Sequence, residues 1–134
     1  MAVQLSVTVR NDCLNQLETT IGPSPTMEIR TGAAPANCAA ADTGTVLATL
    51  TLPSNWLTDA SSGQKTISGT WQDLSCDASG TAGHWRIKQG ATCHMQGNCS
   101  NPGGGGDLEI TPNTTVTLGA SFTVNTFTLT GGNS

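Results

Sequence analysis

Short segments of alternating apolar and polar residues dominate the chain beyond Pro25. The segment VLATLTLP (46–53) is the clearest: its even-numbered residues are apolar, Thr49 and Thr51 lie opposite them, and Pro53 follows. Successive side chains of a strand point to opposite faces of the sheet, so this alternation predicts a strand with one buried face. Proline lacks the N–H that a sheet ladder needs, and it therefore ends the segment.

Similar segments, separated by turn signals, predict the remaining strands. They lie at 26–31, within 64–74 with a bulge at Gly69, at 80–90, 92–96 and 107–111, and at two places within 114–132 around Gly119. About eight short strands of regular spacing, with long loops at 32–45 and 97–106, favour a jelly-roll-like antiparallel β-sandwich. The length favours a single domain, 1–134, with a helix at about 6–20 and the β-sandwich at about 26–131.

The last predicted strand carries apolar residues on both faces. Phe122 and Phe127 differ by an odd number of positions, so the period of two places them on opposite faces. We therefore expect this strand to be central or covered on both sides. One phenylalanine should pack in the sandwich core, and the other against the helix or a partner.

The segment before Pro23 shows a helical period instead. Val9, Cys13 and Leu17 fall at i, i+4 and i+8, and Leu14 and Ile21 flank this stripe. Ser6 or Thr8 can cap the start, and Gly22 followed by Pro23 ends the helix. We expect the apolar stripe to cover a face or edge of the sheet; docking on a partner is the alternative.

Charge and hydropathy exclude several classes of protein. Only 10% of the residues are charged, against about a quarter in a typical domain. The net charge is −4, and the five cations are scattered, which argues against direct contact with nucleic acid: Arg10, Arg30, Lys65, Arg86 and Lys88. No window approaches the roughly 18 apolar residues of a membrane span. The N-terminus, MAVQLSVTVRND, shows no signal-peptide pattern, and the odd number of cysteines is unlike a secreted disulfide framework, so we expect reduced thiols in a cytoplasm.

The stretch ATCHMQGNCSNPGGGG (91–106) holds the densest group of reactive side chains. A zinc site would recruit Cys93 and Cys99, with His94 and His84, but the spacing lacks the paired pattern of zinc sites. A Cys93–Cys99 disulfide would close a short ring and leave three of the five cysteines unpaired. We favour a hairpin that turns into a surface loop, with small thiols and no chemistry.

Other catalytic or binding patterns are weaker. Neither histidine lies in a nucleophile motif such as G-x-S-x-G. The run GGGGD (103–107) lacks the strand-then-helix context of a phosphate loop. Trp56, Trp71 and Trp85 fit core anchors better than a ligand site, and a catalytic pair among the nine carboxylates stays open. We therefore expect no enzyme, and no catalytic, cofactor or metal site.

Four segments carry a resemblance to a known family: RNDCLNQLETTIG (10–22), MEIRTGAAP (27–35), SGTAGHWRI (79–87) and GASFTVNTFTLTGGN (119–133). Together they resemble the small structural proteins encoded beside the major capsid protein in tailed bacteriophages, which include jelly-roll cement, or decoration, proteins. The shared features are structural: the Thr31–Gly32 turn, Ser79–Ala82 at the start of a strand, and the terminal FTLTGGN (127–133). The chain departs from the family by its five cysteines, by Arg30 at a position where an aromatic is expected, and by its SNPGGGG loop.

The resemblance implies a non-enzymatic virion protein that binds the outer surface of an assembled capsid across subunit junctions and stabilises it. Its partner would be the major capsid protein, and it would act as a homodimer or another symmetric homo-oligomer. A tail-associated receptor- or carbohydrate-binding β-sandwich module remains the alternative, because sandwich folds also serve lectins. That module would need a tryptophan-lined site, and a small hydrolase would need a carboxylate pair.

Overall fold

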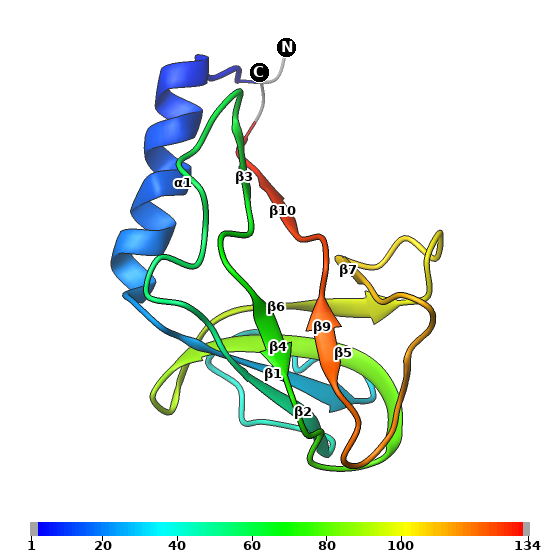
Figure 1. Cartoon of the computed structure of the whole chain (residues 1–134). Helices are drawn as coiled ribbons and strands as arrows, with labels where there is room; N and C mark the ends of the chain where they lie inside the picture. The colour runs from blue at the N-terminus through cyan, green and yellow to red at the C-terminus, as the bar shows by residue number, and fades with distance from the viewer. Residues whose placement is uncertain (1–2, 133–134) are drawn as a thin grey trace.

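The longest strand, β5 (Gly80–Gln89), forms the middle of a six-stranded sheet in the computed structural model, which describes residues 3–132. The order is β2-β1-β5-β6-β7, and β8 pairs with the first residues of β5 (Figure 1). The bounds are β1 Thr26–Thr31, β2 Val46–Thr51, β6 Thr92–Ser100, β7 Leu108–Glu109 and β8 Thr115–Val116. The two long neighbours β5 and β6 form a hairpin that turns at Gly90, where φ is +63°.

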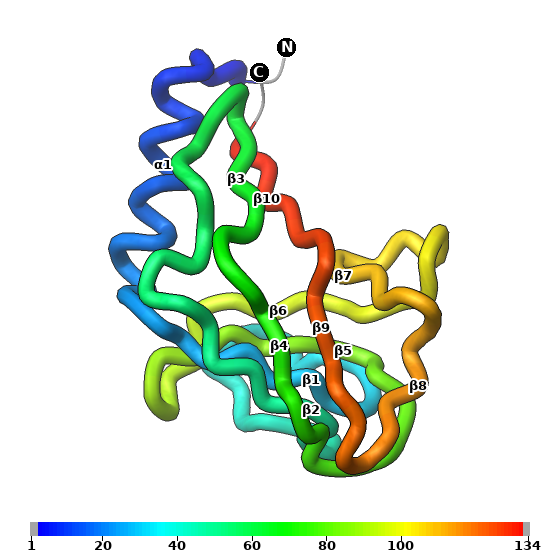
Figure 2. Tube along the Cα trace, in the orientation of Figure 1, coloured from blue at the N-terminus to red at the C-terminus, as the bar shows by residue number. Residues whose placement is uncertain are grey.

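Two short strand pairs lie outside this sheet. β4 (Trp71–Asp73) pairs with β9 (Phe122–Val124), and β3 (Gln64–Thr66) pairs with β10 (Thr128–Thr130). β4 also contacts β2, and side chains of both β4 and β9 join the core of the main sheet. The tube in Figure 2 shows β3 and β10 running together beside the helix, away from the sheet.

The predicted fold class is confirmed: the chain is mainly β and sandwich-like, with one N-terminal helix. Its sheet is mixed, because β6 and β7 pair in parallel while the other pairs are antiparallel. The expected strands at 26–31 and 46–53 are found at Thr26–Thr31 and Val46–Thr51. The strand expected at 92–96 continues to Ser100, and the segment 64–74 holds two strands, separated near Gly69 at φ +74°.

The core fills the space between the main sheet and the β4–β9 pair. Trp85 and Ile87 of β5 point into it, as their alternation predicts, together with Met27 and Ile29 of β1. All three tryptophans are buried within it. Trp71 Nε1 donates to the carbonyl oxygen of Trp56 at 3.1 Å, and Trp56 Nε1 donates to that of Gly22. The interpretation of the tryptophans as core anchors is confirmed.

The prediction for Phe122 and Phe127 is wrong, because both side chains are buried in the same core cluster. β9 ends at Val124, and residues 125–127 leave the ladder before β10 begins. The period of two therefore does not continue from one phenylalanine to the other. The strand is also not central: β9 pairs only with β4, and β10 only with β3, among the described strands.

The helix α1 (Val7–Ile21) forms where it was predicted, within one residue at each end. Ser6 caps it by accepting the N–H of Val9 at 3.3 Å, and Gly22, at φ +91°, donates to the carbonyl oxygen of Glu18 as the helix ends. None of the described helices is long and apolar enough to cross a bilayer.

The helix is turned by roughly a quarter turn from our expectation, so that the flanking residues Leu14 and Ile21 are buried and the stripe itself is exposed. Val9 is 44% exposed and Leu17 37%, and Cys13 between them is exposed as well. The side chains buried against the body of the protein are Arg10, Leu14 and Ile21. The apolar stripe thus does not cover the sheet.

Polar side chains hold α1 in place together with the buried Leu14 and Ile21. Asn11 accepts the N–H of Gly63 at 2.9 Å, and Arg10 Nε donates to the carbonyl oxygen of Gly131 at 2.8 Å. Asn15 Oδ1 accepts both the N–H of Ala60 and the ammonium of Lys65. Charge-assisted hydrogen bonds are stronger than neutral ones, and those of Arg10 and Lys65 link the helix to segments far away in the sequence.

Candidate functional site

The outer face of the main sheet carries a group of charged residues under the loop 32–45. His84, Arg86 and Lys88 alternate with the core residues of β5 and point to this face. All three side chains are buried, although charged side chains are usually exposed to solvent. The cover is the loop between β1 and β2, a run of small residues containing a single carboxylate, Asp42.

Arg86 organises this loop. Its guanidinium donates to the carbonyl oxygens of Asn37, Cys38 and Ala40 at 3.3, 3.0 and 3.2 Å, and it forms an ion pair with Asp42. A rigid guanidinium with five donors suits this convergence of backbone oxygens better than an ammonium would. Burial is the largest single effect and opposes the charge of Arg86, but the hydrogen bond to Asp42 and the neighbouring Cys93 together outweigh it and raise the pKa.

The carboxylates of Asp42 and Glu28 neutralise the charges of Lys88 and Arg30 on the same face. Lys88 Nζ pairs with both carboxylates, at 3.1 Å from Glu28 Oε1. Arg30 Nη2 lies 2.8 Å from Glu28 and 3.3 Å from Asp42. The hydrogen bond from Lys88 is the main cause that holds the pKa of Asp42 below its ordinary value. We name these five residues, Glu28, Arg30, Asp42, Arg86 and Lys88, the ion cluster.

The ion cluster is suited to structure rather than to chemistry. Each carboxylate contacts at least two cations, so neither is poised as a general base. His84 lies beside the cluster, fully buried, with Nδ1 2.9 Å from the carbonyl oxygen of Gly32. The arrangement fastens the 32–45 loop to the sheet.

The structure separates the residues of the hypothetical zinc site. His84 is buried under the loop, whereas His94 lines a shallow surface pocket with Cys13 and Leu17 of α1. Cys99 packs against the core, where burial and then Asp107 raise its pKa to about 12. Within residues 3–132, no three histidine, cysteine or acidic side chains group closely enough to hold a metal ion.

The alternative of a Cys93–Cys99 disulfide is wrong. Both residues lie on β6, and six residues of a strand span about 20 Å. A disulfide needs Cα atoms within roughly 7 Å. Cys93 instead lies beside Cys38 of the 32–45 loop, with the two sulfur atoms 2.9 Å apart. The sequence held no spacing signal for this pair, since 55 residues separate its members.

A groove of about 390 Å³ lies between residues 106–111 and 122–128. Asp107 and Glu109 are among the residues that line it, which makes them a candidate for the carboxylate pair that a hydrolase would need. Asp107 accepts the N–H of Asn98 at 3.0 Å, and Glu109 accepts that of Gly105 at 3.3 Å. Both acids thereby brace the loop 101–106. The glycine run ends in a strand, β7, and not in a helix, so the phosphate-loop context is missing as expected.

Apart from Val3 and Val7 near the N-terminus, the exposed large apolar side chains lie at two separate places. The first, which we name the helix surface, consists of Val9, Cys13 and Leu17, which follow one another at intervals of four residues on α1. The second, the loop surface, consists of Leu74 and Leu118, which are 69% and 62% exposed.

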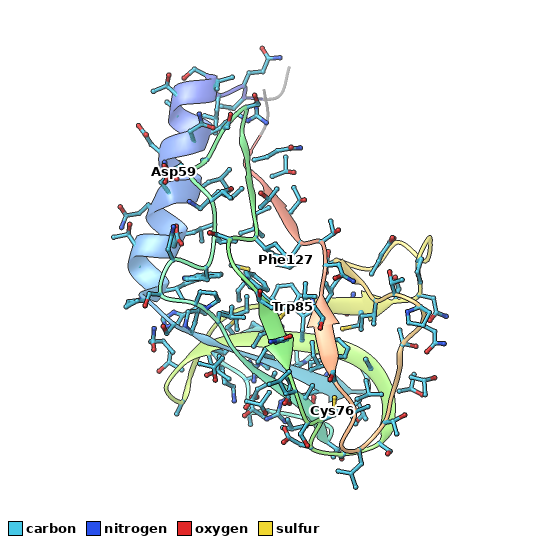
Figure 3. All side chains as sticks on the ribbon, viewed as in Figure 1. Asp59, Cys76, Trp85 and Phe127 are labelled. Atoms are coloured by element: carbon cyan, nitrogen blue, oxygen red, sulfur yellow. The ribbon has the colours of Figure 1, made fainter. Side chains whose placement is uncertain are left out.

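Backbone hydrogen bonds hold the two loops of the loop surface together. The Cys76 N–H donates to the carbonyl oxygen of Ala120 at 2.8 Å, and the Gly119 N–H donates to that of Cys76 at 2.9 Å. In Figure 3, Cys76 lies at the lower end of the protein, opposite the end where α1 begins. The core around Trp85 and Phe127 lies between the two surfaces. The chain thus presents two apolar surfaces that are separated by the core.

Comparison with known proteins gives no relative: no family model, curated protein or solved structure matches the chain.

Proposed function

We propose that the protein is a non-enzymatic structural protein of a bacteriophage virion, which binds the outside of an assembled capsid and stabilises it. The sequence segments quoted above supply the resemblance to capsid cement proteins. The observation that carries the proposal is the pair of separated apolar surfaces, one on α1 and one at Leu74 and Leu118. A protein that holds two neighbouring subunits together needs two contact surfaces on a rigid body.

Each surface supplies the kind of side chain that association buries. Apolar area removed from water contributes roughly 25 cal/mol per Å², and a specific interface buries on the order of 1,600 Å² in total. Val9 and Leu17 are already partly exposed in the free protein, so no unfolding of the helix is needed. The major capsid protein is the proposed partner.

A symmetric homo-oligomer, most simply a dimer, belongs to the same proposal. On each side of Cys13 the stripe carries an aliphatic residue four positions away, Val9 and Leu17. A two-fold interface places the same patch against itself, which such a stripe permits. Its two-fold axis would pass near Cys13.

The charged residues support a structural role over an enzymatic one. Three of the five cations, Arg30, Arg86 and Lys88, are buried in the ion cluster. Lys65 is buried against Glu18 at 3.2 Å, and Arg10 against the C-terminal segment. These charges are used within the fold, so binding should depend only modestly on salt.

The alternative, a tail-associated carbohydrate-binding module, has less support. Such a site would stack sugars on exposed aromatic rings, but Trp56, Trp71 and Trp85 are at most 2% exposed. Phe122 and Phe127 are buried too.

Co-sedimentation with capsids tests the proposal. The protein should sediment with assembled heads and bind isolated capsid subunits weakly, because contacts that straddle two subunits exist only in the shell. Leu17→Lys should weaken binding at least tenfold, whereas the matched control Thr19→Lys, on an exposed part of the same helix outside the stripe, should bind normally. Equal binding to heads and to free subunits, or labelling at the tail tip, would contradict the proposal.

A further inference from the structure

We propose that Cys38 and Cys93 are the site of a disulfide that fastens the 32–45 loop to β6. Their sulfur atoms lie 2.9 Å apart, and both residues are half-buried. A disulfide would bring the sulfurs to about 2.05 Å, a movement of less than about 1 Å. The inference stands on this geometry and does not depend on the proposed function.

The backbone around both residues is already fixed where the bond needs it. Arg86 restricts the conformation of the loop, because its guanidinium donates to the carbonyl oxygens of Asn37, Cys38 and Ala40 at the same time. Cys93 lies in β6, opposite Lys88 of the central strand. Because the ion cluster and the sheet hold the two chain segments independently, bond formation requires no rearrangement of either.

The other three cysteines lie elsewhere. Cys13 is on the exposed side of α1, Cys76 is buried in the core, and Cys99 is packed against the core further along β6. The structure therefore selects one pair out of five thiols.

Small molecules can reach this pair. Cys38, Cys93, Asp42 and Arg86 line a surface pocket next to the 90–92 turn. A low-molecular-weight disulfide such as oxidised glutathione is the oxidant we assign. One protein thiolate attacks it and releases one small thiol; the second protein thiolate then attacks the mixed disulfide and releases another. The two cysteines lose two protons and two electrons, and one small disulfide becomes two small thiols.

The rate should be slow at neutral pH. Burial, with the neighbouring Cys93 sulfur, raises the pKa of Cys38 to about 11, so little of its thiolate is present. In a reducing compartment the pair stays as thiols, and an oxidising compartment converts it. The bond would then link two segments 55 residues apart, which restricts the unfolded chain and raises Tm by roughly 5–15 °C.

Peptide mapping of the intact, unmodified protein tests the pairing. After incubation with oxidised glutathione and blocking of the remaining thiols, trypsin places Cys38 on fragment 31–65 and both Cys93 and Cys99 on fragment 89–134. Cyanogen bromide cleaves after Met95 and so separates Cys93, on 89–95, from Cys99, on 96–134. We expect 31–65 joined to 89–95, three free thiols per chain, and the higher Tm, reversed by a reductant.

One variant and its matched control complete the test. Cys93→Ser should abolish both the cross-link and the redox-dependent rise in Tm, and Cys99→Ser should preserve both. The proposal is overturned if 31–65 is joined to 96–134, if it is joined to no other fragment while thiols are consumed, or if Cys93→Ser keeps the rise in Tm.

Discussion

The rings of Trp85 and Phe127 meet nearly at right angles, with centroids 5.2 Å apart and planes at 86°. Trp85 belongs to the central strand of the main sheet, and Phe127 to the segment between β9 and β10. Phe127 also contacts Trp71, at 5.4 Å between centroids. One side chain thus joins the C-terminal segment to both layers of the core, as Figure 3 shows for Trp85 and Phe127.

Phe127→Ala should therefore be strongly destabilising. Truncation of a buried phenylalanine costs about 3–5 kcal/mol, and it lowers Tm by roughly 10–20 °C for a domain of this size. Thermal unfolding followed by circular dichroism measures this, with Leu118→Ala, at an exposed position, as the control. A Tm for Phe127→Ala within 2–3 °C of the control would show that the contact is unimportant.

Asn15→Ala should loosen the helix. The substitution removes the acceptor of the Ala60 N–H and of the Lys65 ammonium, which is 1% exposed. An unsatisfied buried donor costs about 1–3 kcal/mol. Urea unfolding measures the loss, and Gln16→Ala on the exposed side of α1 is the matched control. Equal stability of the two variants would mean that polar contacts do not hold α1.

Asp42→Asn should destabilise the protein by about 1–3 kcal/mol near pH 7. Loss of a wholly buried partner costs roughly 3–5 kcal/mol, and we expect less here because the Asp42 side chain is 35% exposed. Arg86 and Lys88 would remain buried with one carboxylate fewer. Asp59→Asn, at an exposed position next to α1 in Figure 3, is the control.

The effect of Asp42→Asn should also depend on pH. Since its folded-state pKa lies below the ordinary value of 3.8, ionised Asp42 contributes its full stability above about pH 5, and the contribution is lost as the pH falls through the folded-state pKa. The difference in unfolding free energy between wild type and Asp42→Asn should thus be constant from pH 5 to 8 and shrink below about pH 4. A difference that grows on acidification would contradict this assignment of charge.

The sequence predicted those elements whose signals are local. The strand Thr26–Thr31 follows from the alternation of its residues after Pro25. The helix Val7–Ile21 follows from its Ser6 cap and from Gly22 and Pro23 at its end. The helix face could not be predicted in this way. An apolar stripe is expected to be buried, yet Asn11 and Asn15 find their partners near residues 60–65, about 50 positions away, and turn the stripe outward.

The ion cluster and the cysteine pair were missed for the same reason. The period of two in β5 is enough to place Arg86 and Lys88 on one face of the strand, but nothing local indicates that Asp42 covers them. Cys38 lies in a loop of small residues without any pattern, and only the folding of that loop over the sheet brings it to Cys93. The error for Phe127 has a different cause. The alternation of a strand was extended across residues 125–127, which are not part of any strand.

The most direct test of the proposed function is the heat stability of DNA-filled heads with and without the protein. Heads from which the protein is stripped or omitted should release their DNA at a lower temperature than complete heads. Adding the purified protein should restore the original threshold, because contacts across subunit junctions resist expansion of the shell. Leu17→Lys should restore it poorly, and Thr19→Lys fully. Heads that release DNA at the same temperature in the presence and absence of the protein would contradict the account.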